Sequence, residues 1–422
     1  MTDPQPSRLA RRLGVGDAVM IGLGSMIGAG VFAALAPAAR AAGSGLLIGL
    51  LIAAVIAFCN ATSSAELAAI YPASGGAYVY GRRRLGAFWG YLAGWGFVVG
   101  KLASCAAMAL TVGAYAAPSW QHPIAIASVA ALVAVNYHGV QKTAALTRVI
   151  VTIVLGALAL VVIGALFGGH ATAANVHTGL TAAGWRGVLQ SAGLLFFAFA
   201  GYARIATLGE EVRDPERTIP TAIPRALGIT LVVYVIVAVS ALAAAGAAGL
   251  ASSDAPLATA VRIGDLDALT PVVRVGGTIA ALGVLLSLIA GVGRTGFAMA
   301  SDRELPAWLD AVHPKYKVPH HAELAVGVIV AAVVTVADVR DVIGFSSFCV
   351  LTYYAIANAS AWTLPRPQLR WPRVLAAVGL VGCAVLALTL PATTALTGAG
   401  VLGVGAVVWC LRHRQRTKED QR

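Results

Sequence analysis

Long apolar runs, each near the length that crosses a bilayer, follow one another along most of the chain and are separated by short polar segments. They cover residues 14–40, 44–69, 86–116, 122–138, 145–168, 186–211, 220–249, 270–299, 320–337, 341–363, 372–390 and 393–411. A helix of about 20 apolar residues spans the hydrocarbon core of a membrane. The pattern therefore predicts an all-α integral membrane protein with about twelve transmembrane helices.

The first predicted span contains four glycines between Gly22 and Gly30, in the stretch GLGSMIGAG. Each glycine weakens a helix interior by about 1 kcal/mol relative to alanine, so several together favour a break. Backbone groups freed at membrane depth are tolerated only against protein or a water-filled cavity. The amides of Gly28, Ala29 and Gly30 would then begin a second half-helix, whose positive end suits a carboxylate. Close helix packing by small residues is the alternative interpretation.

The sixth span has a matching interruption at Gly201, within a run of aromatic residues. Broken helices at corresponding places in two halves of a chain are the sequence pointer to a transporter site at the midplane. An odd number of spans in each half inverts the second half. We therefore predict a five-plus-five inverted repeat with broken helices 1 and 6. Its parts are an N-terminal tail (1–13), a first repeat (14–168), a second repeat (186–363), helices 11 and 12 (372–411) and a C-terminal tail (412–422).

The composition agrees with a membrane protein: 59% of the 422 residues are hydrophobic and 11% are charged, where a soluble protein has about 25% charged residues. The net charge of +12 comes largely from arginines and lysines that gather in alternate connections, such as 82–84 and 213–225. By the positive-inside rule, both termini are expected in the cytoplasm of a multi-pass cell-membrane protein. The charge thus indicates topology, and nucleic acid is not an expected partner. Five cysteines lie in apolar runs without metal-ligand spacing, so neither a metal nor a cofactor is expected.

Charged residues also stand inside the predicted spans. Lys101 lies in the third span and Arg204 just past the break in the sixth. A lysine at a helix centre costs about 2.5–3.5 kcal/mol on insertion. It could meet a substrate carboxylate, take part in proton coupling, or snorkel to the membrane surface. Arg204 could bind an anion or a carbonyl at the broken helix, while Glu210 and Glu211 favour pairing with loop arginines or closing an inner gate.

Three motifs carry a resemblance to a known family: IGLGSMIGAGVF (Ile21–Phe32), FFAFAGYARIATLGEEVRDPERTIPTAI (Phe196–Ile223) and GRTGFAMASDRELPAWLDAVHPKYKVP (Gly293–Pro319). Through them the chain resembles the amino acid–polyamine–organocation superfamily of permeases, which have the LeuT-type inverted-repeat fold. The resemblance covers about residues 10–365.

The resemblance implies an α-amino acid substrate held between the two broken helices. Its carboxylate would meet the backbone around Ile27, Gly28, Ala29 and Gly30, and its ammonium the carbonyl groups of residues 197–200. The implied substrate-binding residues on the sixth span are Phe197, Ala198, Phe199, Ala200 and Ala203, with Lys101 added from the third span. Phe199 or Tyr202 could supply an aromatic gate. Lys101, Tyr202, Arg204 and Glu210 are the expected coupling or gating residues.

The chain departs from the family pattern at three places. Several family members carry a lysine in the fifth span in place of sodium, but Val154 and Leu155 stand there. Some members with cationic substrates have an acidic residue near Ala203, where this chain has Arg204. Sodium-dependent relatives use paired hydroxyl groups on the eighth span, and here Ser287 stands alone in its segment. Proton symport or exchange is therefore favoured over sodium coupling.

The predicted function is secondary active transport of a neutral or acidic amino acid, without enzymatic activity. Transport of polyamines or other organic cations, and a non-transporting sensor or channel, are the alternatives. The expected partners are the substrate, protons and the lipid bilayer, and both a monomer and a homodimer remain open.

Overall fold

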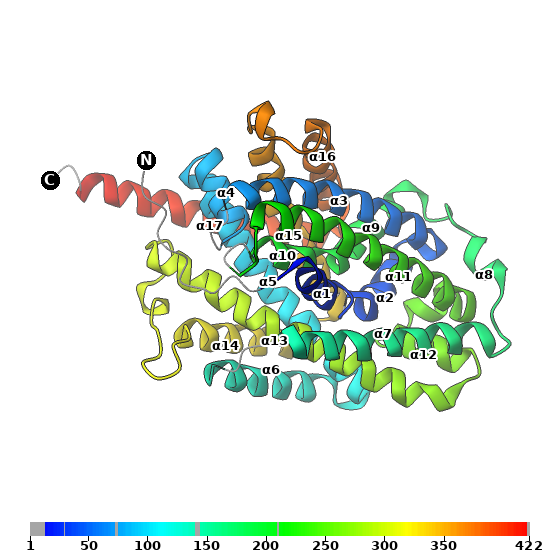
Figure 1. Ribbon diagram of the computed structural model, residues 1–422. Helices are drawn as coiled ribbons and strands as arrows, with labels where there is room; N and C mark the ends of the chain where they lie inside the picture. Colours follow the sequence, from blue (N-terminus) through cyan, green and yellow to red (C-terminus); the bar gives the residue numbers. More distant parts are fainter. Residues whose placement is uncertain (1–12, 29, 72–74, 140–143, 209–210, 420–422) are drawn as a thin grey trace.

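The structure is a computed structural model that describes residues 13–28, 30–71, 75–139, 144–208 and 211–419, most of them helical (Figure 1). The predicted residues Ala29 and Glu210 lie outside these ranges. The longer helices are α1 (Val15–Met26), α2 (Gly30–Ala42), α3 (Leu46–Ile70), α5 (Ala87–Ala116), α6 (Gln121–Tyr137), α7 (Ala144–Phe167), α9 (Gly184–Phe199), α11 (Pro215–Ala251), α13 (Thr270–Ser301), α14 (His320–Val336), α15 (Val339–Trp362), α16 (Arg373–Thr389) and α17 (Ala392–Glu419). Shorter helices are α4 (Ala77–Arg84), α8 (Ala173–His177), α10 (Ala203–Ala206) and α12 (Pro256–Ile263).

Each apolar run predicted from the sequence coincides with a helix or, at the first and sixth runs, with a broken helix. In the described part of the chain, nine helical stretches are long and apolar enough to cross a membrane, and α1, α14 and α16 are shorter apolar helices. The only extended pairing among the described residues is a bridge between Leu13 and Val212. An all-helical membrane protein is therefore confirmed.

Some boundaries differ from the prediction. The sixth run was expected to continue to residue 211, but its helix ends at Ala206. The next helix begins at Pro215, five residues before the start at Pro220 that the sequence suggested. Proline suits the first position of a helix because that position needs no amide hydrogen bond. The short helices α4, α8 and α12 were not predicted, because eight or fewer residues give too little periodicity.

Helix α5 occupies the interior of the bundle and packs against α13 on one side and α15 on another. Helix α2 packs against α9 and α11, and α3 packs against α9 and α11. Alanine and glycine fill many of the contact surfaces, which lets backbones approach closely, as in other membrane bundles. The broken segments α1–α2 and α9–α10 therefore lie side by side in the core.

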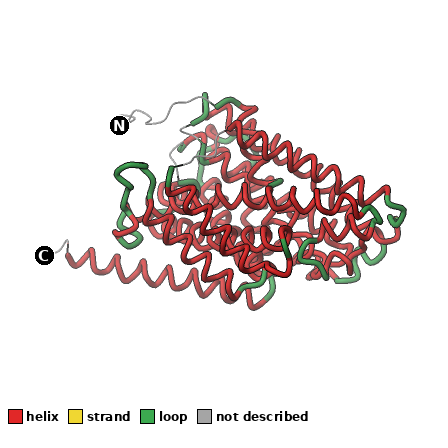
Figure 2. Tube along the Cα trace, turned by 90° about the horizontal axis from the view of Figure 1, so that it is seen from below, coloured by secondary structure: helices red, strands yellow, loops and turns green. Residues whose placement is uncertain are grey.

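The bundle has two distinct ends (Figure 1). Helix α4, the segment 302–319 and the C-terminal part of α17 lie at one end, at the left of the figure, whereas α8 and α12 lie at the other. Arg82 in α4 forms an ion pair of 2.8 Å with Asp302, and Arg412 in α17 donates a hydrogen bond of 3.0 Å to the Glu304 carbonyl. Figure 2 shows α17 projecting beyond the bundle at this same end. We call it the basic end, for Arg82, Arg83, Arg84 and Arg412.

Candidate functional site

The two helix breaks touch each other. Helix α1 ends at Met26 and α2 begins at Gly30, while α9 gives way to a 3-10 turn over Ala200–Tyr202 before α10. A Cβ atom on Gly30 would lie 2.4 Å from Ala198 Cα, and one on Gly201 would lie 2.3 Å from the Ser25 carbonyl oxygen. Real Cβ atoms do not approach backbone so closely, so the glycines permit this contact.

Tyr234 of α11 joins the two breaks from behind. Its hydroxyl oxygen lies 2.5 Å from the Met26 carbonyl oxygen and 3.1 Å from that of Ala198, and donates its proton to these acceptors. Its ring packs against Phe199 with 5.2 Å between ring centroids. Because buried carbonyl groups need hydrogen-bond donors, this one hydroxyl stabilises both interrupted helices.

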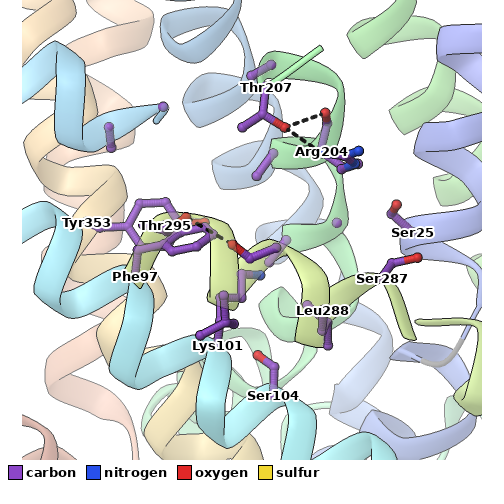
Figure 3. Close-up of a pocket in the computed structure, with 18 of the residues that line it drawn as sticks. Ser25, Phe97, Lys101, Ser104, Arg204, Thr207, Ser287, Leu288, Thr295 and Tyr353 are labelled. Atoms are coloured by element: carbon purple, nitrogen blue, oxygen red, sulfur yellow. Dashed lines mark hydrogen bonds between the residues drawn. The ribbon is translucent and has the colours of Figure 1, made fainter. Parts of the chain in front are cut away.

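A cavity of about 220 Å³ opens beside the breaks (Figure 3). Its walls come from both broken helices and from α5, α13 and α15. Polar and charged groups stand among apolar ones, which is the usual make-up of a small-molecule site. The lining includes Ser25, Met26, Gly30, Phe97, Lys101, Ser104, Phe197, Ala198, Ala200, Gly201, Ala203, Arg204, Ser287, Leu288, Arg294, Thr295, Tyr353 and Tyr354.

Lys101 is buried in the wall of this cavity, with 7% of its surface exposed. The ammonium group has no hydrogen bond or ion pair with any residue that the structure describes. One turn further along α5, the hydroxyl groups of Ser104 and Ser346 form a hydrogen bond with each other, with 2.7 Å between their oxygen atoms. A buried charge without a partner is costly. An anion that entered the cavity could pair with the Lys101 ammonium and offset this cost.

Two arginines line the cavity closer to the basic end. Arg204 in α10 lies 4.0 Å from a carboxylate oxygen of Glu211 and donates to the Thr207 hydroxyl at 3.4 Å (Figure 3). Arg294 in α13 also lines the cavity. It has no ion pair within 4.0 Å among the described residues.

The cavity reaches the basic end of the bundle through Gly75, Gly76 and Tyr78. The Tyr78 hydroxyl donates to Asp302, and Arg82 donates to the same phenol at 2.9 Å. Burial, and then the hydrogen bond to Asp302, raise the pKa of Tyr78 above its ordinary value of 10.0. The phenol therefore stays neutral and links α4 to the end of α13.

The opposite side of the breaks is closed by packing. Phe32 and Tyr115 meet edge to face with 5.4 Å between ring centroids. The Tyr115 hydroxyl donates to the Phe32 carbonyl at 3.1 Å and accepts from the Leu257 amide at 3.3 Å. Helix α12 thus covers the α2–α5 contact, and in this conformation the cavity extends toward the basic end.

The structure brings together most of the predicted substrate-binding residues. Those that line the cavity are Gly30, Lys101, Phe197, Ala198, Ala200 and Ala203. Ile27 is buried in the core beside it, and Gly28 lies against Val284 and the Gly24 carbonyl, where a Cβ atom would meet them at 2.4 Å and 2.6 Å. Phe199 faces Tyr234. Arg204 lines the cavity, whereas Tyr202 stacks on Tyr354 behind the wall, with centroids 5.1 Å apart.

Tyr234 and Arg294 were missed by sequence reasoning. Arg294 stands inside an apolar run, the same signal that singled out Lys101, and could have been found. Tyr234 could not, because one tyrosine in an apolar run has no distinguishing pattern. No group of three or more metal-ligating side chains occurs within the described ranges.

Comparison of the sequence with known proteins identifies its family. The sequence matches the amino acid permease family over residues 17–365. The chain belongs to the amino acid permease family. A transporter of Mycobacterium tuberculosis, whose name gives no substrate, is 63% identical over 412 residues. The match covers 97% of this chain and 93% of the relative.

More distant relatives of this permease differ in their named substrates. The branched-chain amino acid permease BcaP of Bacillus subtilis is 24% identical, covering 98% of this chain and 95% of its own length. Cationic amino acid transporter 7 of Arabidopsis thaliana is 26% identical, covering 81% of this chain and 64% of its own. Because such names vary, the substrate of this permease has to be argued from its own cavity.

Proposed function

We propose that this permease is a secondary active transporter that carries a neutral or acidic α-amino acid across the cell membrane by alternating access. The observation that carries the proposal is the cavity beside two glycine-dependent helix breaks in direct contact. Irregular backbone in a membrane is stable where it lines such a cavity. In this account the chain makes twelve crossings as a five-plus-five inverted repeat, with two further helices and cytoplasmic termini.

The α-carboxylate of the substrate would bind at the start of α2, near the Gly30 amide. The positive end of a helix favours an anion there. The ammonium group of the substrate would bind at the carbonyl groups of the span-six break, around Phe197 and Ala200. Both residues line the cavity together with Gly30, which supports this orientation.

Lys101 supplies the coupling group in this account. Its ammonium has no described partner, so it would either hold the carboxylate or release and regain a proton in each transport cycle. We favour proton symport or exchange over sodium coupling. Sodium-dependent relatives use a pair of hydroxyl groups on this span, whereas Ser287 stands alone in its segment of α13. Organic cations fit less well, since Lys101 and Arg204 would repel them.

The test is uptake by the purified permease in liposomes, with each of the twenty amino acids supplied outside at two pH values, with and without sodium. Saturable uptake of a neutral or acidic amino acid, unaffected by sodium, is the expected result. Uptake of polyamines alone would overturn the choice of substrate, and flux far above the turnover of a carrier would indicate a channel.

A further inference from the structure

The cavity wall carries more positive than negative charge. Among its described lining residues, Lys101, Arg204 and Arg294 are basic, and Glu211 is acidic. Glu211 lies 4.0 Å from Arg204 and offsets part of its charge. Lys101 and Arg294 keep no ion-pair partner within that distance among the described residues.

Other acidic groups near the cavity are already engaged or lie behind its wall. Asp302 and Glu304 pair with Arg82 at 2.8 Å and 3.6 Å. Glu323 of α14 packs behind α13, where its side chain lies against the backbone of Gly293. Its carboxylate forms no ion pair with Arg294 within 4.0 Å. The surface that the described residues present to a ligand therefore remains basic.

A zwitterionic amino acid without a charged side chain cannot use this basic surface fully. Its carboxylate and its ammonium are both matched by the two helix breaks in the orientation proposed above. A second anionic group is needed to meet the cations that remain, and a cationic side chain would be repelled by them.

We propose that the substrate of this permease is an acidic amino acid, whose side-chain carboxylate meets the cation set Lys101, Arg204 and Arg294. This inference rests on the proposed function, since it specifies the ligand of the same cavity. Arg294 and Arg204 lie toward the basic end and draw the anion into the cavity, and Lys101 lies deeper, beside the breaks.

The experiment compares glutamate with glutamine and aspartate with asparagine in proteoliposomes, because each pair differs in charge and hardly in shape. We expect the KM of the acids to be lower than that of the amides by at least about tenfold, the scale of one charge-assisted hydrogen bond. Arg294→Gln and Arg204→Gln should each reduce this preference. Arg262→Gln, which removes an exposed arginine of α12 outside the cavity lining, should leave it unchanged.

The outcomes separate the two proposals. Preferred uptake of amides, of other neutral amino acids or of cationic ones would overturn the acidic substrate and leave amino acid transport intact. A preference for acids that survives both cavity substitutions would also overturn the role of the cation set. Absence of uptake of all twenty amino acids would contradict the proposed function itself.

Discussion

Lys101 is a charged side chain in a place where burial makes charge expensive. It is 7% exposed in the interior helix α5, and its ammonium has no described hydrogen-bond partner. Lysine stems can lie along apolar surface while the head reaches polar surroundings, and here the cavity provides them. The buried ammonium of Lys101 destabilises the folded protein, which favours a functional reason for a lysine at this position.

Lys101→Met should separate the two effects, because methionine keeps much of the side-chain length and removes the charge. We expect the empty protein to be as stable as wild type or more stable, since a buried unpaired charge is lost. Substrate affinity should fall by about tenfold or more, because the substituted side chain offers no charged hydrogen bond. Thermal unfolding with and without substrate measures both quantities.

Lys315→Met is the matched control, since Lys315 is exposed in the segment after α13. Its substrate-dependent shift in unfolding temperature should equal that of wild type. Equal shifts for Lys101→Met and wild type would show that the ammonium does not bind the substrate.

The broken helices act together because they share contacts at three points. Gly30 meets Ala198, Gly201 meets Ser25, and the Tyr234 hydroxyl lies within hydrogen-bonding distance of carbonyl groups on both sides. A half-helix cannot move without exchanging these contacts. Tyr234 therefore belongs to the elements that set the geometry of the breaks, although it does not line the cavity.

Tyr234→Phe should leave the ring packing against Phe199 intact and remove the donor. Two buried carbonyl groups then lose a shared partner, at a cost of about 1–3 kcal/mol. We expect a lower unfolding temperature and a lower maximal transport rate, with a smaller change in KM, because the cavity wall is unaltered. A variant with wild-type stability and rate would show that the hydroxyl is dispensable.

At the scale of the whole molecule, the two ends of the bundle differ in charge and in what they cover. The basic end carries α4, segment 302–319 and the end of α17, and the cavity extends toward it. The other end carries α8 and α12, and α12 covers the closed side. By the positive-inside rule we expect the basic end to face the cytoplasm, and this conformation would then be open inward.

Cysteine labelling tests this orientation. Cys410 is the exposed cysteine among the five, and the others are buried. The Cys410→Ser variant therefore has no exposed cysteine of its own to react with the label. In that background, Asp254→Cys, before α12, should react with a membrane-impermeant maleimide on intact cells. Lys315→Cys should react after the membrane is permeabilised. The reverse pattern would invert the topology and place the open cavity outside.

Much of the fold was predictable because bilayer-spanning helices must be long and apolar, and the glycines between Gly22 and Gly30 mark a weak point in one of them. Lys101 and Arg204 were found because charge is conspicuous in an apolar run. The contact of Tyr234 with both breaks was not predictable, since it depends on how α11 packs behind them. The side that Phe199 faces is likewise set by packing, because an aromatic residue next to a break can turn to the cavity or to the core.

The central claim is that substrate binds at the contact between the two broken helices, and the most direct test is transport by Gly30→Ala. Its added methyl group would lie 2.4 Å from Ala198 Cα and force the breaks apart, whereas that of Gly156→Ala meets nothing within 4 Å. Both variants should reach the membrane in folded form, as size-exclusion profiles would verify. We predict that Gly156→Ala transports amino acids like wild type and that Gly30→Ala loses most uptake. Equal uptake by a folded Gly30→Ala protein would contradict the account.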